Sequence, residues 1–520
     1  MRRRSSSPDR PATRVSFVRV LVVLVAVAGI GWSGTRAVSA LVVGDPEPGP
    51  SHFVPYVDVT ATPRYAFETP EGPAQSTVAL SFVVADPRDP CEPSWGGYYD
   101  LDTAGSDLEL DRRISQLRLT GGDVRVSFGG QAGTELASAC ADPTALRAAY
   151  GAVVDRYDLT AVDLDLEGAT LDDEAGMTRR AAAIKDLQDS ATSADSELAV
   201  WLTLPVGQDG LTEAGRAAVT TVLAAGVDVA GVNGMTMDFG VATSAAQPLS
   251  DVVARAATAL HGQVRTAYAT AGQRLDTAEA WAKVGITPMI GQSDVPAERF
   301  TLEDAAAVNT FAREHGVGLL SMWSLNRDAT CTSPLPSVLT VVQTMCSGVD
   351  QRGESYAEAL ATDLDLLPTG GSTATTGPTT SPEPTATQAP DGVVDDPETS
   401  PYPIWDPAGT YPGSTKVVWR HNVYEARYWT SGVAPDTPVA NPMDSPWTLL
   451  GPVLPGDTPA PLPTFPAGTY PAWDAESVYT AGSRVQVDRV AYEAKWWTQG
   501  QEPGTPVQGG SPWVLVYPDR

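Results

Sequence analysis

Three carboxylates alternate with aliphatic residues in one short segment, and this spacing suits acid catalysis. They are Asp163, Asp165 and Glu167, and a leucine fills each gap. On a β-strand the side-chain period of two puts the three carboxylates on one face, about 6 to 7 Å apart. Carboxyl groups this close cannot all ionise cheaply, so at least one is expected to have a raised pKa. We predict that Glu167 is the proton donor.

The alternative for this segment is a solvated strand face on which acidic residues alternate with core residues. Like charges placed side by side along a strand destabilise it and need a functional reason to exist. We therefore favour the catalytic interpretation.

The segment belongs to a region, residues 50–350, in which apolar runs alternate with amphipathic stretches. Eight runs are predicted as strands, and helices are predicted between them. This alternation predicts an α/β fold, a (β/α)8 barrel. Barrel enzymes keep their active sites at the carboxyl ends of the strands, where these carboxylates would point while the leucines pack outward. The predicted strands are 56–60, 78–85, 124–128, 161–167, 199–204, 229–238, 286–290 and 318–323, and the predicted helices include 106–119, 143–157, 172–194, 212–225 and 302–315.

The C-terminal third has a different composition and contains a repeat. Residues 369–401 are dominated by Thr, Pro, Ser and Gly, which predicts a linker. Two segments, 402–452 and 470–518, are separated by a Pro-rich linker at 453–466 and share aromatic residues at a constant shift, which indicates duplication. Each copy is predicted to be a small all-β module. The matched residues are Trp405, Tyr411, Tyr424, Ala426, Trp429 and Gly432 in the first copy and Trp473, Tyr479, Tyr492, Ala494, Trp497 and Gly500 in the second.

The charge of the chain restricts its partners. The 520 residues carry a formal net charge of -29, and the pI is near 4.4. Nucleic acid is therefore not an expected partner, because phosphate binding needs clustered Lys and Arg. A neutral polymer is compatible with this balance.

The N-terminus has the pattern of an export signal. Arginines at positions 2–4 precede an apolar run at 20–32, and small residues end at Ala40. We expect residues 1–40 to be a cleaved secretory signal, since the run is short for a membrane span. A retained membrane anchor is the alternative. The expected product is a secreted monomer.

Cysteine usage agrees with export. The four cysteines contain no C-x-x-C pair and the four histidines are scattered, so neither a metal site nor a cofactor is expected. An even number of cysteines suggests two disulfides, and of the three connectivities we favour Cys91 with Cys140 and Cys331 with Cys346.

The barrel region resembles the glycoside hydrolase family 18 chitinases. The catalytic motif of that family, D-x-x-D-x-D-x-E, stands here from Thr160 to Glu167, with Thr160 in place of the first Asp. The preceding strand ends in S-x-G-G at 127–130. The sequence Met-Thr-Met-Asp at 235–238 resembles M-x-Y-D, with Met237 where many members have Tyr. Gln292 and Trp323 resemble signatures of the seventh and eighth strands.

The resemblance implies substrate-assisted cleavage of a polymer of β-1,4-linked N-acetylglucosamine, in which the acetamido group of the substrate acts as the nucleophile. It implies that Glu167 protonates the glycosidic oxygen, that Asp165 orients the acetamido N–H and that Asp163 keeps Asp165 poised. It also implies a substrate-binding group made of Asp238, Met235, Met237, Gln292 and Trp323.

Three members of that group have an alternative role. Asp238 is also explained as a strand-end cap, Gln292 as an amide that satisfies loop backbone, and Trp323 as barrel core.

The duplicated modules resemble carbohydrate-binding family 5/12, through Y-x-A-x-W-W-T-x-G at 492–500 and a less perfect copy at 424–432. The expected binding aromatics are Tyr428, Trp429, Trp496 and Trp497, which can lie against a flat polysaccharide face. Adjacent strand residues point in opposite directions, so we expect one aromatic of each pair to be core.

The resulting hypothesis is a secreted chitinase that acts on chitin or a related polymer. The alternatives are a catalytically inert, lectin-like chitin-binding protein and an endo-β-N-acetylglucosaminidase. The presence of Glu167 favours an enzyme, and the modules favour chitin. The short interval between Gln292 and Trp323 leaves no room for an inserted domain, which predicts an open cleft and internal cleavage.

Overall fold

A computed structural model describes most of the chain. The described residues are 49–241, 247–364, 395–407, 409–439, 444–459, 462, 464–504 and 511–516. The predicted signal at 1–40 and residues 369–394 of the predicted linker lie outside them.

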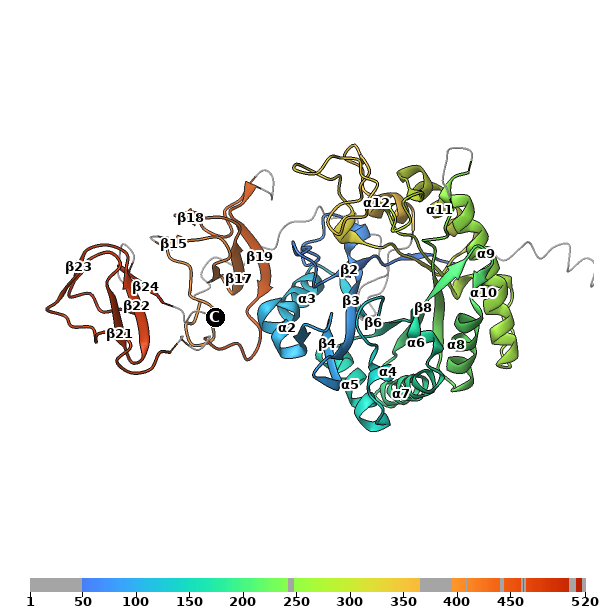
Figure 1. The fold of residues 1–520 in the computed structure, drawn as a ribbon, viewed down its shortest axis with the longest axis horizontal. Helices are drawn as coiled ribbons and strands as arrows, with labels where there is room; N and C mark the ends of the chain where they lie inside the picture. Colours follow the sequence, from blue (N-terminus) through green and yellow to red (C-terminus); the bar gives the residue numbers. More distant parts are fainter. Residues whose placement is uncertain are drawn as a thin grey trace, which may run out of the picture. The chain divides into compact units, whose positions relative to one another are not determined.

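Eight parallel strand positions close into a barrel, as predicted. Two short strands, β1 and β2, together form the first position: β1 pairs with the last strand, and β2 pairs with β3. Each remaining pair of neighbours is parallel, and the helices surround the strands (Figure 1). The strands are β1 (His52–Phe53), β2 (Tyr56–Asp58), β3 (Thr77–Asp86), β6 (Asp123–Gly129), β7 (Ala161–Asp165), β8 (Ala199–Gly207), β10 (Val229–Met235), β11 (Val284–Thr287) and β14 (Leu319–Leu320).

The helices follow the predicted alternation with one difference. The single helix expected at 106–119 is two helices, α2 and α3, because the chain turns at Glu109, whose φ is 54°. Side-chain caps define several starts, for example the reciprocal capping box of Thr301 and Asp304 on α11. The helices are α2 (Leu101–Asp107), α3 (Leu110–Leu119), α4 (Leu136–Ala139), α5 (Pro143–Arg156), α6 (Ala169–Asp172), α7 (Glu174–Ser193), α8 (Glu213–Ala224), α9 (Leu249–Thr270), α10 (Thr277–Ala282), α11 (Leu302–His315) and α12 (Tyr356–Ala361).

Short elements and two disulfides shape the loops of the barrel. The disulfides join Cys91 to Cys140 and Cys331 to Cys346, which confirms the favoured pairing. The first ties strand β4 to the residue that follows α4. The short elements are β4 (Asp89–Trp95), β5 (Tyr99–Asp100), β9 (Gly210–Leu211), β12 (Gly291–Gln292), β13 (Arg299–Phe300) and the 3-10 turns η1 (Pro73–Gln75) and η2 (Leu325–Arg327).

The main core lies between the strands and the helices. Leu164 and Leu166 are buried there, on the outer side of β7, as their alternation with the carboxylates predicted. The inner faces of the strands build a second, smaller cluster around Tyr56 and Trp201. The three carboxylates therefore face the inside of the barrel.

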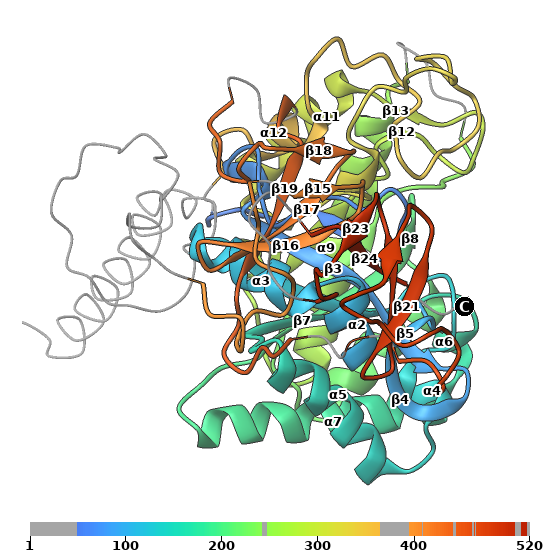
Figure 2. The ribbon, with the colours of Figure 1, turned by 90° about the vertical axis from the view of Figure 1, so that its left-hand side faces the viewer.

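Each C-terminal module contains a three-stranded antiparallel sheet and a two-stranded one, drawn in orange and red in Figure 2. Tyr424 and Trp447 contribute to the core of the first module, and Tyr492 and Trp513 are their counterparts in the second. The strands are β15 (Thr410–Tyr411), β16 (Lys416–Trp419), β17 (Asn422–Ala426), β18 (Thr430–Ser431) and β19 (Trp447–Pro452), then β20 (Val478–Tyr479), β21 (Arg484–Val487), β22 (Val490–Ala494), β23 (Thr498–Gln499) and β24 (Trp513–Leu515).

No helix within the described residues is both long and apolar enough to cross a bilayer. The N-terminal apolar run at 20–32 lies outside those residues.

Candidate active site

Asp163 is held by three hydroxyl groups from neighbouring strands. Tyr56 of β2 donates to Oδ2 at 2.7 Å, and Ser127 of β6 donates to the same oxygen at 2.6 Å. Thr203 of β8 donates to Oδ1 at 2.6 Å. All four side chains are buried. Donors on this many sides fix the orientation of the carboxylate and favour its ionised form.

Further polar contacts continue around the inside of the barrel. Asn233 of β10 donates to Thr203 at 3.0 Å, and the Asn233 amide oxygen accepts from Thr287 of β11 at 2.9 Å. Arg125 faces the same interior two residues before Ser127. Its positive charge also acts to lower the pKa of Asp163.

The electrostatics differ among the three carboxylates. Burial raises the pKa of Asp163, although its three hydroxyl donors act to lower it. Burial, and then the charges of Glu167 and Asp163, raise the pKa of Asp165 well above its ordinary value. Burial and then the charge of Asp238 raise the pKa of Glu167. The pKa of each of the three carboxyl groups is therefore raised, and hydrogen-bond donors oppose the rise only at Asp163.

Strand β7 is shorter than predicted and ends at Asp165. The main chain continues in extended form for one more residue, because the Leu166 N–H donates to Thr203 O at 3.0 Å. Glu167 then begins a turn in which its carbonyl accepts from Thr170 N–H at 3.0 Å. The proposed acid thus stands just past the strand, at the rim of the barrel.

Glycines leave room for this arrangement at the end of β6. Gly129 has a φ of 104°, and a Cβ atom there would lie 2.0 Å from the main-chain oxygen of Asp165. Gly130 has a φ of 84°, and its Cβ atom would lie 2.8 Å from the ring of Phe82. Any side chain at either position would displace a wall of the site.

A cavity of about 110 Å³ lies above the carboxylates. Asp165, Glu167, Asp238, Met235, Met237 and Trp323, six of the sequence-predicted residues, line it. Asp163 does not line the cavity and is buried beside them. The remaining lining residues are Tyr56, Phe82, Gln131, Thr203, Thr287, Met289 and Asp294.

Aromatic rings form the apolar side of the cavity. Trp323 stacks on Phe82, with ring centroids 5.4 Å apart and planes 20° apart, and its centroid lies 6.0 Å from that of Tyr56. Trp323 is only partly buried, so it serves the barrel interior and also presents a surface to the cavity. Such a surface suits the C–H face of a sugar ring.

Asp238 follows the end of β10, in a left-handed backbone conformation with a φ of 54°. Ser293 donates to its Oδ1 at 2.5 Å. This bond joins the loops after the sixth and seventh strands and aims the Asp238 carboxylate into the cavity that Glu167 shares.

Gln292 is not among the residues that line the cavity. Its side-chain N–H groups point to loop carbonyls, with Ser293 O and Glu298 O both at 3.1 Å. Its side-chain oxygen accepts from Arg299 at 3.1 Å. With 1% of its surface exposed, its amide satisfies the loop instead of a ligand.

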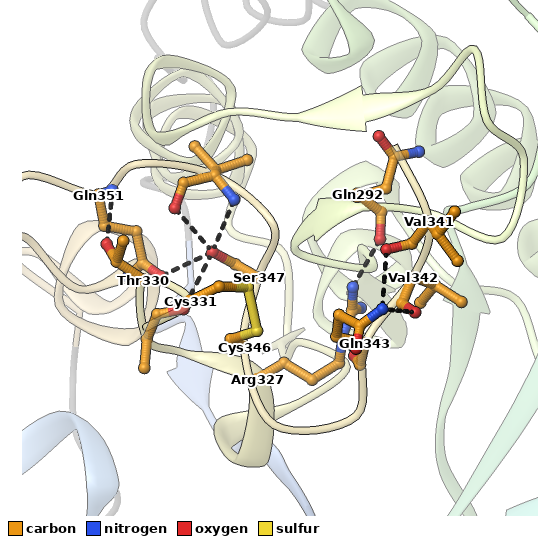
Figure 3. Close-up of a disulfide and its surroundings, with 12 residues drawn as sticks. Gln292, Arg327, Thr330, Cys331, Val341, Val342, Gln343, Cys346, Ser347 and Gln351 are labelled. Atoms are coloured by element: carbon orange, nitrogen blue, oxygen red, sulfur yellow. Dashed lines mark hydrogen bonds between the residues drawn. A yellow bond between two sulfur atoms is a disulfide. The ribbon is translucent and has the colours of Figure 1, made fainter. Parts of the chain in front are cut away.

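The disulfide loop secures the same segment. Arg327 donates to the main-chain oxygens of Gln292, at 2.5 Å, and of Gln343, at 2.8 Å. Figure 3 shows this side chain between the two segments, close to the Cys331–Cys346 bond. The loop thereby holds the backbone that carries Ser293 and Asp294.

Sequence reasoning missed several residues of the site. Tyr56 and Thr203 lie at inward positions of predicted strands, so their parity along the strand could have identified them. Gln131 lies one residue beyond the S-x-G-G motif, and Asp294 lies two residues beyond Gln292. Both are in loops, where the alternation of a strand does not predict the direction of a side chain.

Within the described residues, His, Cys, Asp and Glu side chains form no group of three or more that could hold a metal ion.

The aromatic pairs of the modules differ from the prediction. Tyr428 and Trp429 are 52% and 63% exposed, and Trp496 and Trp497 are 47% and 61% exposed. The expectation that one ring of each pair is core is therefore wrong. The pairs lie between strands, after β17 and β22, so the alternation of a strand does not apply to them.

Comparison with known proteins supports the resemblance to chitinases. Residues 472–514 match the sequence profile of Carbohydrate-binding module family 5/12. The chain is 32% identical to "Endochitinase 11" of Metarhizium anisopliae, over 60% of this chain and 58% of the relative. It is 34% identical to "Probable bifunctional chitinase/lysozyme" of Escherichia coli (strain K12), over 58% of this chain and 33% of the relative.

A solved structure, the catalytic domain of a hyperthermophilic chitinase from Pyrococcus furiosus, is 26% identical with a TM-score of 0.49, covering 60% of this chain and 94% of that one. The chain spans between one third and about six tenths of the length of the two curated relatives.

Proposed function

We propose that this protein is a glycoside hydrolase that cleaves the β-1,4 links between the N-acetylglucosamine units of chitin. One observation carries the proposal: Glu167, with a raised pKa, lines the same cavity as Asp165. One oxygen of Asp165 is buried without a hydrogen-bond partner in the described part of the chain. A buried acceptor of this kind is suited to a donor that arrives with the substrate.

The chemistry needs no protein nucleophile. Glu167 donates its proton to the glycosidic oxygen while the substrate's acetamido oxygen attacks C1, which breaks the C1–O bond and forms an oxazolinium ion. Asp165 shares its proton with Asp163, so that as a carboxylate it accepts the acetamido N–H and offsets the positive charge that develops on the oxazolinium ring. Water then attacks C1 and gives its proton to Glu167, so that the configuration at C1 is retained and the acid is regenerated.

The residues around the cavity position the sugar. Trp323 forms the apolar floor, and Asp238 and Asp294 offer acceptors for sugar hydroxyls. Met235 and Met237 contribute polarisable apolar surface where a neutral ring must fit.

The enzyme is exported and cuts within chains. The N-terminal charge and hydropathy pattern supports export, and so do two disulfides in the described residues. Only β13 and α11, with short connections, lie between Gln292 and β14, which supports a cleft open at both ends. Sequencing the N-terminus of the mature protein distinguishes a cleaved signal from a retained anchor.

The test compares the native enzyme with Glu167→Gln on soluble N-acetylglucosamine oligomers. We expect turnover to fall at least about 1,000-fold with binding retained, because the amide fills the same space without a transferable proton. Glu174→Gln, an exposed change on α7, is the matched control and leaves turnover unchanged. Undiminished turnover by the Glu167 variant would overturn the proposal, as would an inactive native enzyme.

A further inference from the structure

The two modules carry the same pair of opposite charges but use it differently. Arg484 and Glu493 of the second module stand opposite each other on β21 and β22. They form an ion pair at 2.7 Å within the module. The guanidinium also lies 5.8 Å from the ring centroid of Tyr470. In this copy the cation, the acid and the tyrosine satisfy one another.

The first module also has a cation, an acid and a tyrosine at the equivalent positions, Lys416, Glu425 and Tyr402, and Lys416 again stands opposite Glu425. Here each charge pairs with the barrel. Lys416 Nζ lies 2.6 Å from Glu109, and Glu425 lies 3.5 Å from Arg64.

Burial separates the two cases. The side chain of Lys416 is 16% exposed, against 48% for Arg484. Tyr402 donates a short hydrogen bond to Glu109, so the carboxylate receives both the cation and the hydroxyl. Burial opposes ionisation of Glu109, but the charge and hydrogen bonds of Lys416 and Tyr402 outweigh it, and its pKa is lowered.

A second barrel residue completes the contact. Arg112, in the first turn of α3, pairs with Asp457 at 2.9 Å, just beyond the last strand of the first module. It also bonds to Glu109 at 2.9 Å and to the main-chain oxygen of Pro452. Both Arg112 and Glu109 are at most 5% exposed. A buried charge without a partner would destabilise the fold, and here each has a partner of opposite charge.

Close approach at this contact requires a glycine that the second module lacks. Gly451 of the first module has a φ of 141°, and a Cβ atom there would lie 2.6 Å from the main-chain oxygen of Arg112. When the copies are aligned on Trp447 and Trp513, the equivalent residue is Tyr517. Its side chain could not be accommodated against α3. Only the first copy therefore combines these charges with a residue small enough for close contact with α3.

We propose that the first module is a docked part of the catalytic unit, bound to α3 through Glu109 and Arg112. The second module does not bind at this surface. Duplication thus produced two modules with different tasks. Where the proposed function holds, the aromatic pair of the first module is fixed relative to the cleft, and the second module supplies an anchor.

A cleavage experiment tests the docking independently of enzyme activity. A protease recognition sequence is inserted between residues 369 and 394 of the full-length chain, which is then cut and passed through a sizing column with mass detection. We expect the two fragments to elute together, at the mass of one barrel fragment plus one module fragment. Fragments that separate at low salt would overturn the proposal.

Two substitutions locate the contact. Lys416→Glu places two acids face to face, and Gly451→Tyr introduces the residue of the second copy. Each should weaken association of the cut fragments at least about 100-fold. Lys416→Glu leaves the buried Glu109 without its cation, and Gly451→Tyr places a side chain where the module contacts α3. Arg484→Glu is the matched control in the second module and leaves the fragments together.

A thermal scan of the uncut variants provides a second measurement, in case one variant folds poorly. Lys416→Glu should lower the midpoint of the barrel transition by several degrees, whereas Arg484→Glu should leave it in place. Equal shifts of the midpoint for the two variants would refute a contact with the barrel that is specific to the first module.

Discussion

Asp238 and Glu167 line the same cavity, and the charge of Asp238 acts on the pKa of Glu167. The negative charge of Asp238 raises the pKa of Glu167, in addition to the effect of burial. A general acid works only below its own pKa, so the alkaline limb of the pH–rate profile reports this group.

Asp238→Asn should therefore move the alkaline limb of kcat/KM to lower pH. Removal of the neighbouring negative charge lowers the pKa of Glu167, and the acid then loses its proton earlier as pH rises. The measurement is kcat/KM on soluble oligomers across pH. Ser293→Ala is the control, since it removes the hydrogen-bond partner of Asp238 at 2.5 Å but leaves its charge. An alkaline limb that stays in place in Asp238→Asn would show that the two groups are not coupled.

The hydroxyls around Asp163 make a second prediction at this scale. Tyr56→Phe removes one of the three donors without changing the ring. A hydrogen bond to a charged group contributes about 1.5 to 3 kcal/mol, so kcat should fall about 10- to 100-fold, with little change in KM. Steady-state kinetics on soluble oligomers measure both values.

Tyr268→Phe is the matched control for this change. Its hydroxyl is also buried and donates to Val229 O at 2.7 Å, away from the carboxylates. That variant should lose about 1 kcal/mol of stability and keep its kcat. A similar fall in kcat for both variants would mean that Tyr56 acts only through stability.

Side-chain types and spacing predicted which side chains face the barrel interior, because strand parity fixes their direction. Asp163, Asp165 and the two leucines needed only the period of two. The role of Gln292 could not be predicted in this way, because it lies beyond the end of the strand. Tertiary contacts decide whether its amide binds loop carbonyls or a ligand.

At the scale of elements, the alternation of strands and helices predicted the barrel, but the ends of the elements were less certain. The turn at Glu109 divides one expected helix into two, although no Gly or Pro marks the place. This turn also delivers Glu109 to its contact with Lys416. A tertiary contact of this kind gives no signal in helical periodicity.

The two disulfides should contribute differently to stability. They close loops with sequence separations of 49 and 15 residues. In the chain-entropy treatment a longer loop restricts the unfolded state more, giving about 4 kcal/mol for Cys91–Cys140 and about 3 kcal/mol for Cys331–Cys346.

Denaturant unfolding of the two double Cys→Ser variants measures this order. The Cys331–Cys346 variant should in addition raise KM, because its loop holds the backbone next to Asp294 through Arg327. The Cys91–Cys140 variant is its control, since that disulfide ties β4 to the end of α4 and neither cysteine lines the cavity. An unchanged KM in the Cys331–Cys346 variant would show that the loop does not help to position the site.

At the scale of the whole molecule, the chain combines a barrel cavity lined by carboxylates with two surfaces that present paired aromatic rings. The duplication was readable from the sequence, but the different settings of the two copies were not. The charges of the first copy occur at the same positions in the second, and only the structure shows with which residues each charge pairs.

Two modules should retain the enzyme on an insoluble polymer more strongly than either module alone, because the second binding event is intramolecular. Trp429→Ala and Trp497→Ala each remove the most exposed ring of one pair. Each single variant should lose part of its retention on crystalline chitin. Each single variant already gives up the gain in effective concentration, and the double variant should lose nearly all retention because neither module then holds the polymer. Pull-down with increasing amounts of chitin measures retention.

The same variants separate binding from chemistry. Soluble oligomers reach the cleft without the modules, so their kcat/KM should be unchanged in all three variants. Val514→Ala is the control for lost apolar surface, because Val514 is 48% exposed in the second module but is not aromatic; its retention should equal that of the native protein. If the double variant kept full retention on crystalline chitin, the exposed rings would not be the binding surface, and the cleft itself would have to hold the polymer.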